Sequence, residues 1–339
     1  MTAQAIEIEP DQPWTVDRFR PEDAPGVTAL FHSVYGDKYP VRTYLEPELL
    51  AKENREGRVI SSVARIPSGA VVGHNALFNS APNPRIFETG AGVVHTLYRG
   101  GHGIFTQMVA HGIEMGKQSP RVDLIYGEPV CNHPFSQKLG ISLKFEARAM
   151  EVSLMPAAAY TKEKSAAGRV STLLNFFSLK PKACKVHVPG AYKDQFDACY
   201  MGFEEPRTFE EALGEPEATL SRMDIQTFEF AGVARIAVPD ASRDFESRMA
   251  SEEARLVRNG IRVIQIWLNT GLPQVGGATG VLRSMGYFFG GVLPRWFDTD
   301  GLLMQKVLDE PDWEGTVLVG ERNKKLAALV RGEWECRQV

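Results

Sequence analysis

The sequence GVVHTLYRGGHGIFTQMV at residues 92–109 constrains this 339-residue chain more than any other stretch. An apolar run leads to Arg99, glycines follow at positions 100, 101 and 103, and apolar residues at helical spacing begin at Ile104. This order predicts a strand, a glycine turn and a helix N-terminus, where free backbone N–H groups lie at the positive end of the helix dipole. Glycine permits the positive φ angles and the close approach of an oxyanion that a Cβ would block. The stretch therefore predicts an anion site, with phosphate as its expected occupant and Arg99 as a cation at its rim.

Two familiar phosphate-binding loops do not match this stretch. The pattern GxxxxGK[ST] is absent from the chain. The dinucleotide pattern GxGxxG fails because Gly101-His102-Gly103 is followed by Ile-Phe-Thr, and no acidic residue stands about twenty positions further on in a second strand. A plain glycine turn before a core helix is the alternative to an anion site.

The loop resembles the acyl-CoA loop of the GNAT family of N-acetyltransferases, whose signature is Arg/Gln-x-x-Gly-x-Gly/Ala after a strand that ends in valine. Residues 94–100 are similar to the strand exit of that family, and residues 103–105 to its helix entry. Arg99 and Gly103 are four positions apart where the family has three, so the loop is expected to bulge. Two other stretches also resemble the family: residues 20–24 its first strand-to-helix corner, and residues 132–141 its late asparagine-to-YxKLGF segment.

The first 155 residues predict the element order β-α-α-β-β-β-α-β-α-β, which is the order of the GNAT fold. The expected strands are 14–20, 59–66, 71–78, 87–97, 122–126 and 143–154, and the expected helices are 20–34, 44–55, 103–117 and 132–139, the last ended by Gly140. The expected fold class is therefore α/β, with a mixed, mostly antiparallel sheet flanked by helices, and residues 1–155 form the expected acyl-CoA-binding domain.

The remaining residues predict a linker and then a second domain. Residues 156–217 form the expected linker and insertion, with a strand at 185–188 and a helix at 192–203. Alternation resumes over 218–339, where the expected strands are 227–238 with a break at Gly232, 262–268, 287–289 and 302–307, and the expected helices are 242–258 and 279–285. Residues 283–288 are similar to 138–141, which favours a degenerate second GNAT-like copy. At its loop position, residues 238–242 lack arginine and glycine, and Asp240 would repel a pyrophosphate. We therefore expect one acyl-CoA site per chain, in the first half.

Composition excludes several classes of protein. A formal net charge of −4 gives no basic footprint for nucleic acid, and the chain has no apolar run near the roughly eighteen residues of a membrane span. The N-terminus lacks the basic and apolar regions of a signal peptide, and the four cysteines have no CxxC spacing, so a cytoplasmic protein with reduced thiols is expected. The seven histidines lack metal-ligand spacing, so no metal is expected. A monomer or a homodimer is expected.

The resemblance implies that acyl-CoA, with acetyl-CoA the first expectation, is a co-substrate whose thioester an amine attacks directly. It implies the following cofactor contacts: Val93, Val94, Thr96, Arg99, Gly100, Gly101, His102, Gly103, Ile104 and Asn132. Pantetheine is expected to pair with the strand backbone where a bulge splays the sheet. Tyr35, Tyr39 and Arg42 follow the first helix, in the region that caps the acceptor in this fold, and are candidate substrate contacts.

The expected catalytic residues are Glu88, His95 and Tyr126. Glu88 and His95 are alternatives for the general base, together with Glu128. The family's tyrosine acid falls on Ser136, whose hydroxyl is too weak an acid for that role. Tyr126 or Tyr98 is expected to replace it, unless the thiolate leaves unassisted, since a thiol pKa near 8.5 makes it a tolerable leaving group.

The function expected from these observations is transfer of an acyl group from acyl-CoA to the amine of a small-molecule or amino-acid-like acceptor. The main alternative is a catalytically silent acyl-CoA-binding regulatory protein, which Ser136 and the lengthened loop favour. A third reading is a transferase loaded from acyl-carrier protein or aminoacyl-tRNA, and the acidic composition argues against the tRNA version.

Overall fold

The computed structural model describes residues 8–100, 103–156 and 168–337. The chain divides into two compact units, which are described separately. Unit 1 comprises residues 1–127 and 178–180, and unit 2 comprises residues 128–177 and 181–339. The expected boundary at residue 155 differs from this division, because residues 128–155 pack with the C-terminal half of the chain. The expected linker at 156–217 contributes three strands and a helix.

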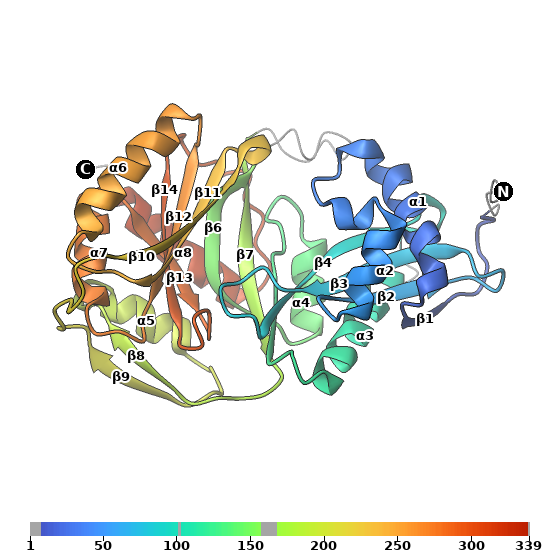
Figure 1. Cartoon of the computed structure of the whole chain (residues 1–339), viewed down its shortest axis with the longest axis horizontal. Helices are drawn as coiled ribbons and strands as arrows, with labels where there is room; N and C mark the ends of the chain where they lie inside the picture. The colour runs from blue at the N-terminus through green and yellow to red at the C-terminus, as the bar shows by residue number, and fades with distance from the viewer. Residues whose placement is uncertain (1–7, 101–102, 157–167, 338–339) are drawn as a thin grey trace. The chain divides into compact units, whose positions relative to one another are not determined.

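Unit 1 is a five-stranded sheet with helices on both faces (Figure 1). Its elements are β1 (Thr15–Arg18), α1 (Ala24–Tyr35), α2 (Pro47–Arg55), β2 (Val59–Arg65), β3 (Val71–Phe78), β4 (Ile86–Val94), α3 (Ile104–Gln118) and β5 (Leu124–Gly127). The strands lie in the order β1-β2-β3-β4-β5. All neighbours are antiparallel except β4 and β5, which are parallel.

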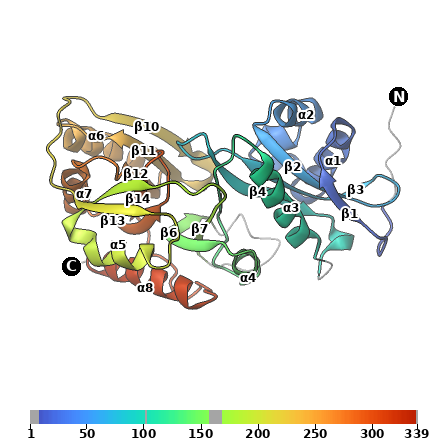
Figure 2. The same cartoon turned by 90° about the horizontal axis from the view of Figure 1, so that it is seen from below.

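The two faces of this sheet carry different helices, as Figure 2 shows. On β3, the backbone of Gly73 lies against Met108 of α3, and the next side chain, His74, packs on Phe31 of α1. Side chains alternate between the faces of a strand, so α1 and α3 cover opposite faces. The α1 face holds an apolar core that includes Val27, Phe31 and Leu50.

A buried ion pair fixes the corner between β1 and α1. The Nε atom of Arg65 on β2 donates to Oδ1 of Asp23 at 2.6 Å, and its Nη2 atom also contacts that carboxylate. Asp23 further accepts the backbone N–H of Arg20 at 2.6 Å. The segment predicted to turn from strand to helix is therefore anchored to the sheet by a charge-assisted contact.

Unit 2 contains a seven-stranded sheet and a small two-stranded sheet. Its elements are α4 (Phe135–Ser142), β6 (Glu146–Met155), β7 (Val170–Ser178), β8 (Cys184–Val188), α5 (Lys193–Tyr200), β9 (Arg207–Glu211), β10 (Arg222–Phe228), β11 (Val233–Asp240), α6 (Phe245–Arg258), β12 (Val263–Asn269), α7 (Val275–Ser284), β13 (Phe288–Leu293), β14 (Gly301–Val307) and α8 (Glu321–Glu335). The large sheet has the order β7-β6-β13-β14-β12-β11-β10, in which only β11 and β12 are a parallel pair. Strands β8 and β9 pair in parallel.

One apolar core joins the strands of unit 2 to helices α5, α6, α7 and α8. It includes Phe196, Met249, Leu282 and Val330, one from each helix, and Ile266 from β12. These five side chains are 0–1% exposed. Burial of this kind contributes about 1.5–3 kcal/mol for each large apolar side chain.

Two predicted elements of unit 2 differ from the structure, and other elements were not predicted. Helix α4 continues through Gly140 to Ser142, where an added Cβ would make a close contact of 3.0 Å with the side-chain amide nitrogen of Asn175. The expected break at Gly232 is present, but the chain reverses there: Gly232 has φ +62° and lies between two antiparallel strands, the first of which begins at Arg222. Strand β7 and helix α8 were not predicted from the sequence.

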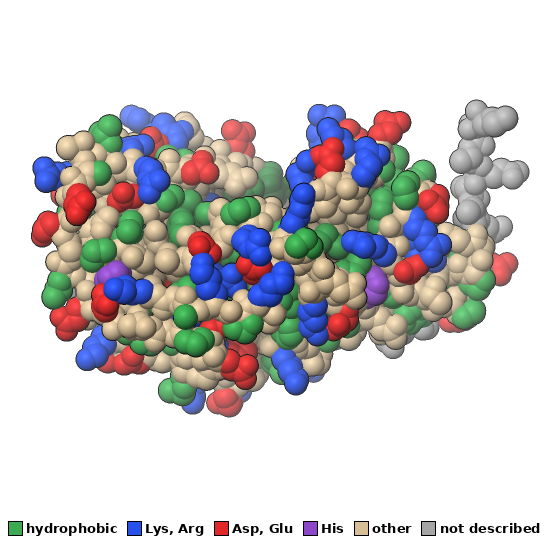
Figure 3. Space-filling model, turned by 60° about the horizontal axis from the view of Figure 1, so that its bottom comes forward, with side chains coloured by type: hydrophobic (Ala, Val, Ile, Leu, Met, Phe, Trp, Pro, Cys, Tyr) green, Lys and Arg blue, Asp and Glu red, His purple; other side chains and the backbone are tan. Residues whose placement is uncertain are grey.

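Among the described residues, no helix combines the length and apolar character needed to cross a membrane. Acidic and basic side chains are interspersed on the face of the molecule seen in Figure 3. This distribution agrees with the small net charge of −4.

Candidate functional site

The second half of β4 is the open part of the unit 1 sheet. Strand β4 pairs with β5 only from Ile86 to Glu88, and beyond that point it pairs with β3 alone. Residues 88–92 are all half-buried, whereas every residue of β2 is buried. The side chains of residues 90–92 are small and leave the strand backbone accessible, which is what a ligand that pairs with a strand requires.

A β-bulge lies in this open half of β4. The register with β3 shifts between Gly90 and Val93, so Ala91 and Gly92 stand opposite the single residue Asn75. Ala91 has φ +49°, a left-handed conformation that costs a non-glycine residue about 1–3 kcal/mol. The structure thus contains a bulge on the strand where the resemblance implies one, and its surroundings must hold Ala91 in place.

The segment between β4 and α3 leaves the sheet earlier than predicted. The strand ends at Val94, and residues Thr96–Tyr98 form a 3-10 turn. The Nδ1 atom of His95 accepts the backbone N–H of Leu97 at 3.4 Å, so His95 caps this turn. The exposed side chain of Arg99 folds back, and its Nε atom donates to the carbonyl of Val94 at 2.9 Å.

Two glycines before α3 adopt positive φ angles, as the sequence predicts. Gly100 and Gly103 have φ angles of +87° and +71°, and Gly103 is the N-cap of the helix. The backbone N–H of Gln107 donates to the carbonyl of Gly103, so the N–H groups of residues 104–106 precede the helical hydrogen bonds. The first turn of α3 has no acidic residue. Gly101 and His102, two predicted contacts, lie outside the described residues.

Glu88 and Tyr126 meet at the other end of the open strand. The phenolic oxygen of Tyr126 on β5 donates to Oε2 of Glu88 at 3.2 Å. The hydroxyl of Ser80, in the turn between β3 and β4, donates to the same carboxylate oxygen at 2.7 Å and also contacts the Tyr126 hydroxyl. Two of the three predicted catalytic residues therefore share one network, and Ser80 is a member that the sequence did not reveal.

His95 lies at the opposite end of β4 from Glu88. The two residues are seven positions apart, which spans roughly 20 Å of extended strand, so they cannot act on the same atom. Burial lowers the pKa of His95, and the positive charge of Arg99 lowers it further. Its position beside the loop, together with its capping contact, separates it from the Glu88 network.

Two of the three predicted substrate contacts belong to an aromatic cluster on the α1 face. The ring of Tyr39 lies 4.8 Å from the ring of Phe31 and 5.0 Å from that of Tyr35, measured between centroids. Burial, followed by the charges of Tyr35 and Glu88, raises the pKa of Tyr39. Arg42 is not part of this cluster: its exposed side chain donates to Glu46 at 2.7 Å.

Other candidates have different surroundings. Tyr98, one alternative acid, is buried and donates to the carbonyl of Glu9 at 2.6 Å. Glu128, one alternative base, belongs to unit 2 and accepts from Nη2 of Arg235 at 3.0 Å. Asn132 precedes α4 in unit 2, and the hydroxyl oxygen of Ser136 on that helix is buried without a hydrogen-bond partner among the described residues.

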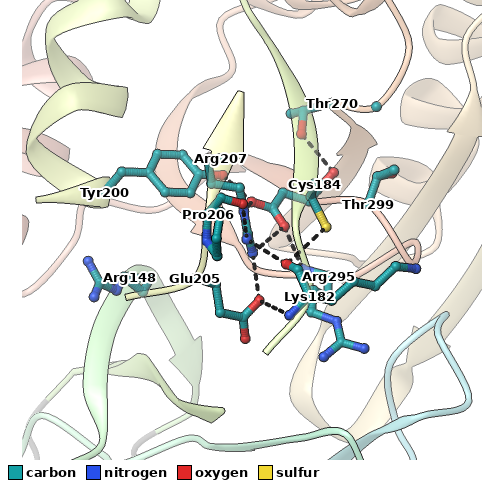
Figure 4. Close-up of polar contacts among 12 residues, drawn as sticks. Arg148, Lys182, Cys184, Tyr200, Glu205, Pro206, Arg207, Thr270, Arg295 and Thr299 are labelled. Carbon is teal, nitrogen blue, oxygen red and sulfur yellow. Dashed lines mark hydrogen bonds and ion pairs between the residues drawn. The ribbon is translucent and has the colours of Figure 1, made fainter. Parts of the chain in front are cut away.

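A dense polar cluster in unit 2 was not predicted from the sequence (Figure 4). The Nε atom of Arg207 and the hydroxyl of Tyr200 each donate to Oδ2 of Asp300 at 2.6 Å. Oδ1 of Asp300 accepts the backbone N–H of Arg295 at 2.8 Å, and Arg207 also donates to Glu205 at 3.1 Å. The side chains of Arg207 and Asp300 are 2% and 0% exposed. The members satisfy one another, so this cluster anchors β9 to the segment before β14.

The parallel strands of unit 2 do not part as those of unit 1 do. Strands β11 and β12 pair without interruption from Val233–Val263 to Val238–Leu268. A small cleft of about 180 Å³ lies at their carboxyl ends and is lined by residues including Pro239, Asn269 and Gln274, with no lysine or arginine. Neither an open strand nor a cation for phosphate is present there.

No group of three or more His, Cys, Asp or Glu side chains within the described parts of the chain is placed to hold a metal ion. The four cysteines are free thiols, and burial raises the pKa of Cys131 and of Cys199 to about 12.

Comparison with known proteins finds structural matches only. No family model matches the chain, and no curated protein gives a significant sequence match. Many solved acetyltransferases match about half of it. An N-acetyltransferase from Staphylococcus aureus matches at 16% identity and a TM-score of 0.39, over 50% of this chain and 99% of that one. A ribosomal-protein-alanine N-acetyltransferase from Brucella melitensis matches at 19% identity and a TM-score of 0.39, over 48% and 99%. A Salmonella typhimurium protein solved with its cofactor acetyl-CoA matches at 14% identity and a TM-score of 0.40, over 51% and 97%.

These matches cover nearly all of each solved acetyltransferase but only about half of this chain. Their TM-scores are below 0.5, so the likeness by itself assigns neither an activity nor an acceptor.

Proposed function

We propose that unit 1 is the catalytic part of an N-acyltransferase that moves an acyl group from acyl-CoA to the amine of a small molecule. One observation carries the proposal: a bulged, half-open strand runs from the paired Glu88 and Tyr126 directly to the glycine-rich N-terminus of α3. An acyl donor of this kind has phosphates at one end and a reactive thioester at the other. The phosphates suit the N-terminus of α3, and the thioester suits the end of the strand near Glu88 and Tyr126.

The residues of unit 1 fit the parts of acyl-CoA in order along the chain. The N–H groups of residues 104–106 and the cation of Arg99 would receive the pyrophosphate. The backbone of Val93 and Val94 would pair with pantetheine, which resembles a strand in its amide spacing. The thioester would then lie over Gly90, Ala91 and Gly92, within reach of Glu88. Acetyl is the proposed acyl group, because the Glu88 network closes this end of the strand.

The chemistry assigned to Glu88 and Tyr126 follows from their contact. An ammonium acceptor must lose a proton before its nitrogen attacks the thioester carbonyl, and Glu88 is the proposed acceptor of that proton. The C–N bond forms, the C–S bond breaks, and the departing thiolate takes a proton from Tyr126. Glu88 then returns a proton to Tyr126 directly or through Ser80, and the remaining proton goes to solvent. A strand N–H at the bulge would stabilise the oxyanion.

The aromatic cluster is the proposed wall of the acceptor site. Tyr35 and Tyr39 lie on the same face of the sheet as Glu88, whose charge affects the Tyr39 phenol. Cation–π attraction from such rings would favour the ammonium form of an amine.

We propose that unit 2 contains a degenerate second copy of the fold. The order β10-β11-α6-β12-α7-β13-β14 repeats the order β3-β4-α3-β5-α4-β6-β7, and each series has one parallel strand pair, β11 with β12 and β4 with β5. The second pair stays closed, and its loop has Asp240 where the first has glycines. One acyl-CoA per chain is therefore expected.

Titration calorimetry with CoA, run beside a thiol-release assay with acetyl-CoA and a panel of amines, tests the proposal. The expected result is one CoA per chain together with turnover on at least one amine. Binding of CoA without turnover on any amine would favour the alternative, a catalytically silent acyl-CoA-binding regulatory protein. Absence of CoA binding would remove both.

A further inference from the structure

His74 is a buried histidine to which the chemistry proposed for unit 1 gives no role. It lies on β3 and is 0% exposed. Its Nδ1 atom lies 2.9 Å from the carbonyl oxygen of Ala91, and its Nε2 atom lies 2.9 Å from the hydroxyl of Ser61. A carbonyl can only accept, so Nδ1 carries the proton and donates to Ala91, and Nε2 accepts the proton of Ser61.

The Ala91 carbonyl needs a partner because of the bulge. Ala91 is one of two residues opposite Asn75, and its positive φ turns its peptide away from the regular ladder. Backbone groups displaced from a ladder are usually satisfied by side chains or water. The imidazole supplies that hydrogen bond. The regular register resumes at the pair formed by His74 and Val93.

The imidazole ring is held rigidly. The rings of Phe31 and Tyr44 pack edge-on to it at centroid distances of 5.6 and 5.5 Å. Burial lowers the pKa of His74 to about 4, so the ring is neutral at physiological pH and keeps one donor and one acceptor. The two aromatic rings, the Ser61 hydroxyl and the Ala91 carbonyl together fix the direction of the Nδ1–H bond toward the bulge.

We propose that His74 is a positioning residue that holds the β4 bulge open and so orients the strand N–H groups that face the acyl group. The effect of this role on catalysis rests on the proposed function, whereas the effect on the bulge does not. A substitution that removes the donor should let β4 relax toward a regular ladder, and a one-residue slip would reverse the faces of Val93 and Val94.

Three variants of the full chain test this role. His74→Leu removes both hydrogen bonds, His74→Asn keeps an N–H donor near the position of Nδ1, and Ser61→Ala removes only the bond to Nε2. Nitrogen-15 NMR of the wild-type protein reports the tautomer, hydrogen exchange reports the amides of residues 91–93, and steady-state kinetics report kcat and KM.

The expected tautomer has the proton on Nδ1. In His74→Leu the bulge amides should exchange faster and kcat should fall by about 10²-fold, the scale of losing one oxyanion donor. The KM for acyl-CoA should change much less, because the phosphates are held by the loop and α3. His74→Asn should recover part of both losses, and Ser61→Ala, which keeps the Nδ1–H donor, should lose less than either His74 variant.

A proton on Nε2, or wild-type exchange at residues 91–93 in His74→Leu, would overturn the proposal. If His74→Leu does not fold, the other two variants decide. Faster exchange of the amides of residues 91–93 in Ser61→Ala than in His74→Asn would contradict the role of the Nδ1–H donor. A wild-type protein that turns over no amine defeats the proposed function alone, and the tautomer and exchange measurements still decide whether His74 holds the bulge.

Discussion

The hydroxyl of Tyr126 and the carboxylate of Glu88 lie 3.2 Å apart, on neighbouring parallel strands at the point where those strands separate. An acid and a base in direct contact can exchange a proton without solvent. Because both side chains also contact Ser80, each is held in one position relative to the open strand.

Substitution of Glu88 by glutamine should lower kcat for amine acylation by about 10²- to 10⁴-fold, the usual cost of losing a general base. The amide cannot accept the ammonium proton, but CoA binding should be unchanged because Glu88 lies at the far end of β4 from the loop. Kinetics and calorimetry check the two parts. Glu114→Gln on the exposed surface of α3 is the matched control. Equal rates in both variants would exclude Glu88 as the base.

Substitution of Tyr126 by phenylalanine should slow transfer from acetyl-CoA, because the thiolate would leave without a proton. The loss should shrink with an aryl thioester, whose thiolate is a better leaving group and needs less assistance. Rates with both donors in wild type and Tyr126→Phe measure this difference. A loss of the same size for both thioesters would assign Tyr126 a structural role.

Substitution of Gly103 by valine should abolish the increase in melting temperature caused by CoA. A ligand at a hundredfold excess over its Kd stabilises a protein by about 2.7 kcal/mol. An added Cβ at Gly103 meets nothing within 4 Å, so the loss would come from the φ of +71°, which valine does not adopt. Gly112→Ala, within α3 and with ordinary contacts of 3.7–3.9 Å, is the matched control. A normal CoA shift in Gly103→Val would place the anion site elsewhere.

Acid should destabilise the fold through His74. The pKa of His74 is about 4 in the folded chain, and its ordinary value is 6.5. As the pH falls, the unfolded chain therefore takes up a proton before the folded chain does. Above pH 6.5, neutral His74 makes its full contribution to the free energy of unfolding. This contribution is lost as the pH falls from 6.5 to 4, and the total loss is about 3 kcal/mol. Urea unfolding over this range measures the slope. His74→Asn should remove that part of the pH dependence, and an unchanged slope would show that His74 is not the titrating group.

Removal of Arg207 should destabilise unit 2 strongly. In Arg207→Met the buried carboxylate of Asp300 loses its ionic partner, and loss of one member of a buried pair costs about 3–5 kcal/mol. Tyr200→Phe removes one hydrogen bond to the same carboxylate and should cost about 1.5–3 kcal/mol. Chemical denaturation of both variants checks the order. A smaller effect for Arg207→Met than for Tyr200→Phe would contradict the role given to the ion pair.

Local patterns predicted much of the fold because they depend on neighbouring residues. The hairpin of β2 and β3, the strand before the loop and the helix α3 follow from alternation, glycine turns and helical spacing. Gly140 misled the prediction of α4, since a glycine that ends one helix allows close packing in another. Strand β7 and helix α8 were not predicted, and the structure defines them through the pairing of β7 with β6 and the packing of α8 on the unit 2 core.

The sequence by itself determined the glycine turn before α3, the order of the unit 1 elements and the types of residue at the candidate site, because each of these depends on spacing along the chain. Only the tertiary structure decided which candidates meet. It joined Glu88 to Tyr126 through Ser80, left His95 as a turn cap and Arg42 on the surface, and placed His74 beneath the bulge. The contacts of Tyr126 with Glu88 and of His74 with Ala91 join residues from different strands. Their distances depend on register, bulges and packing, which local spacing does not encode.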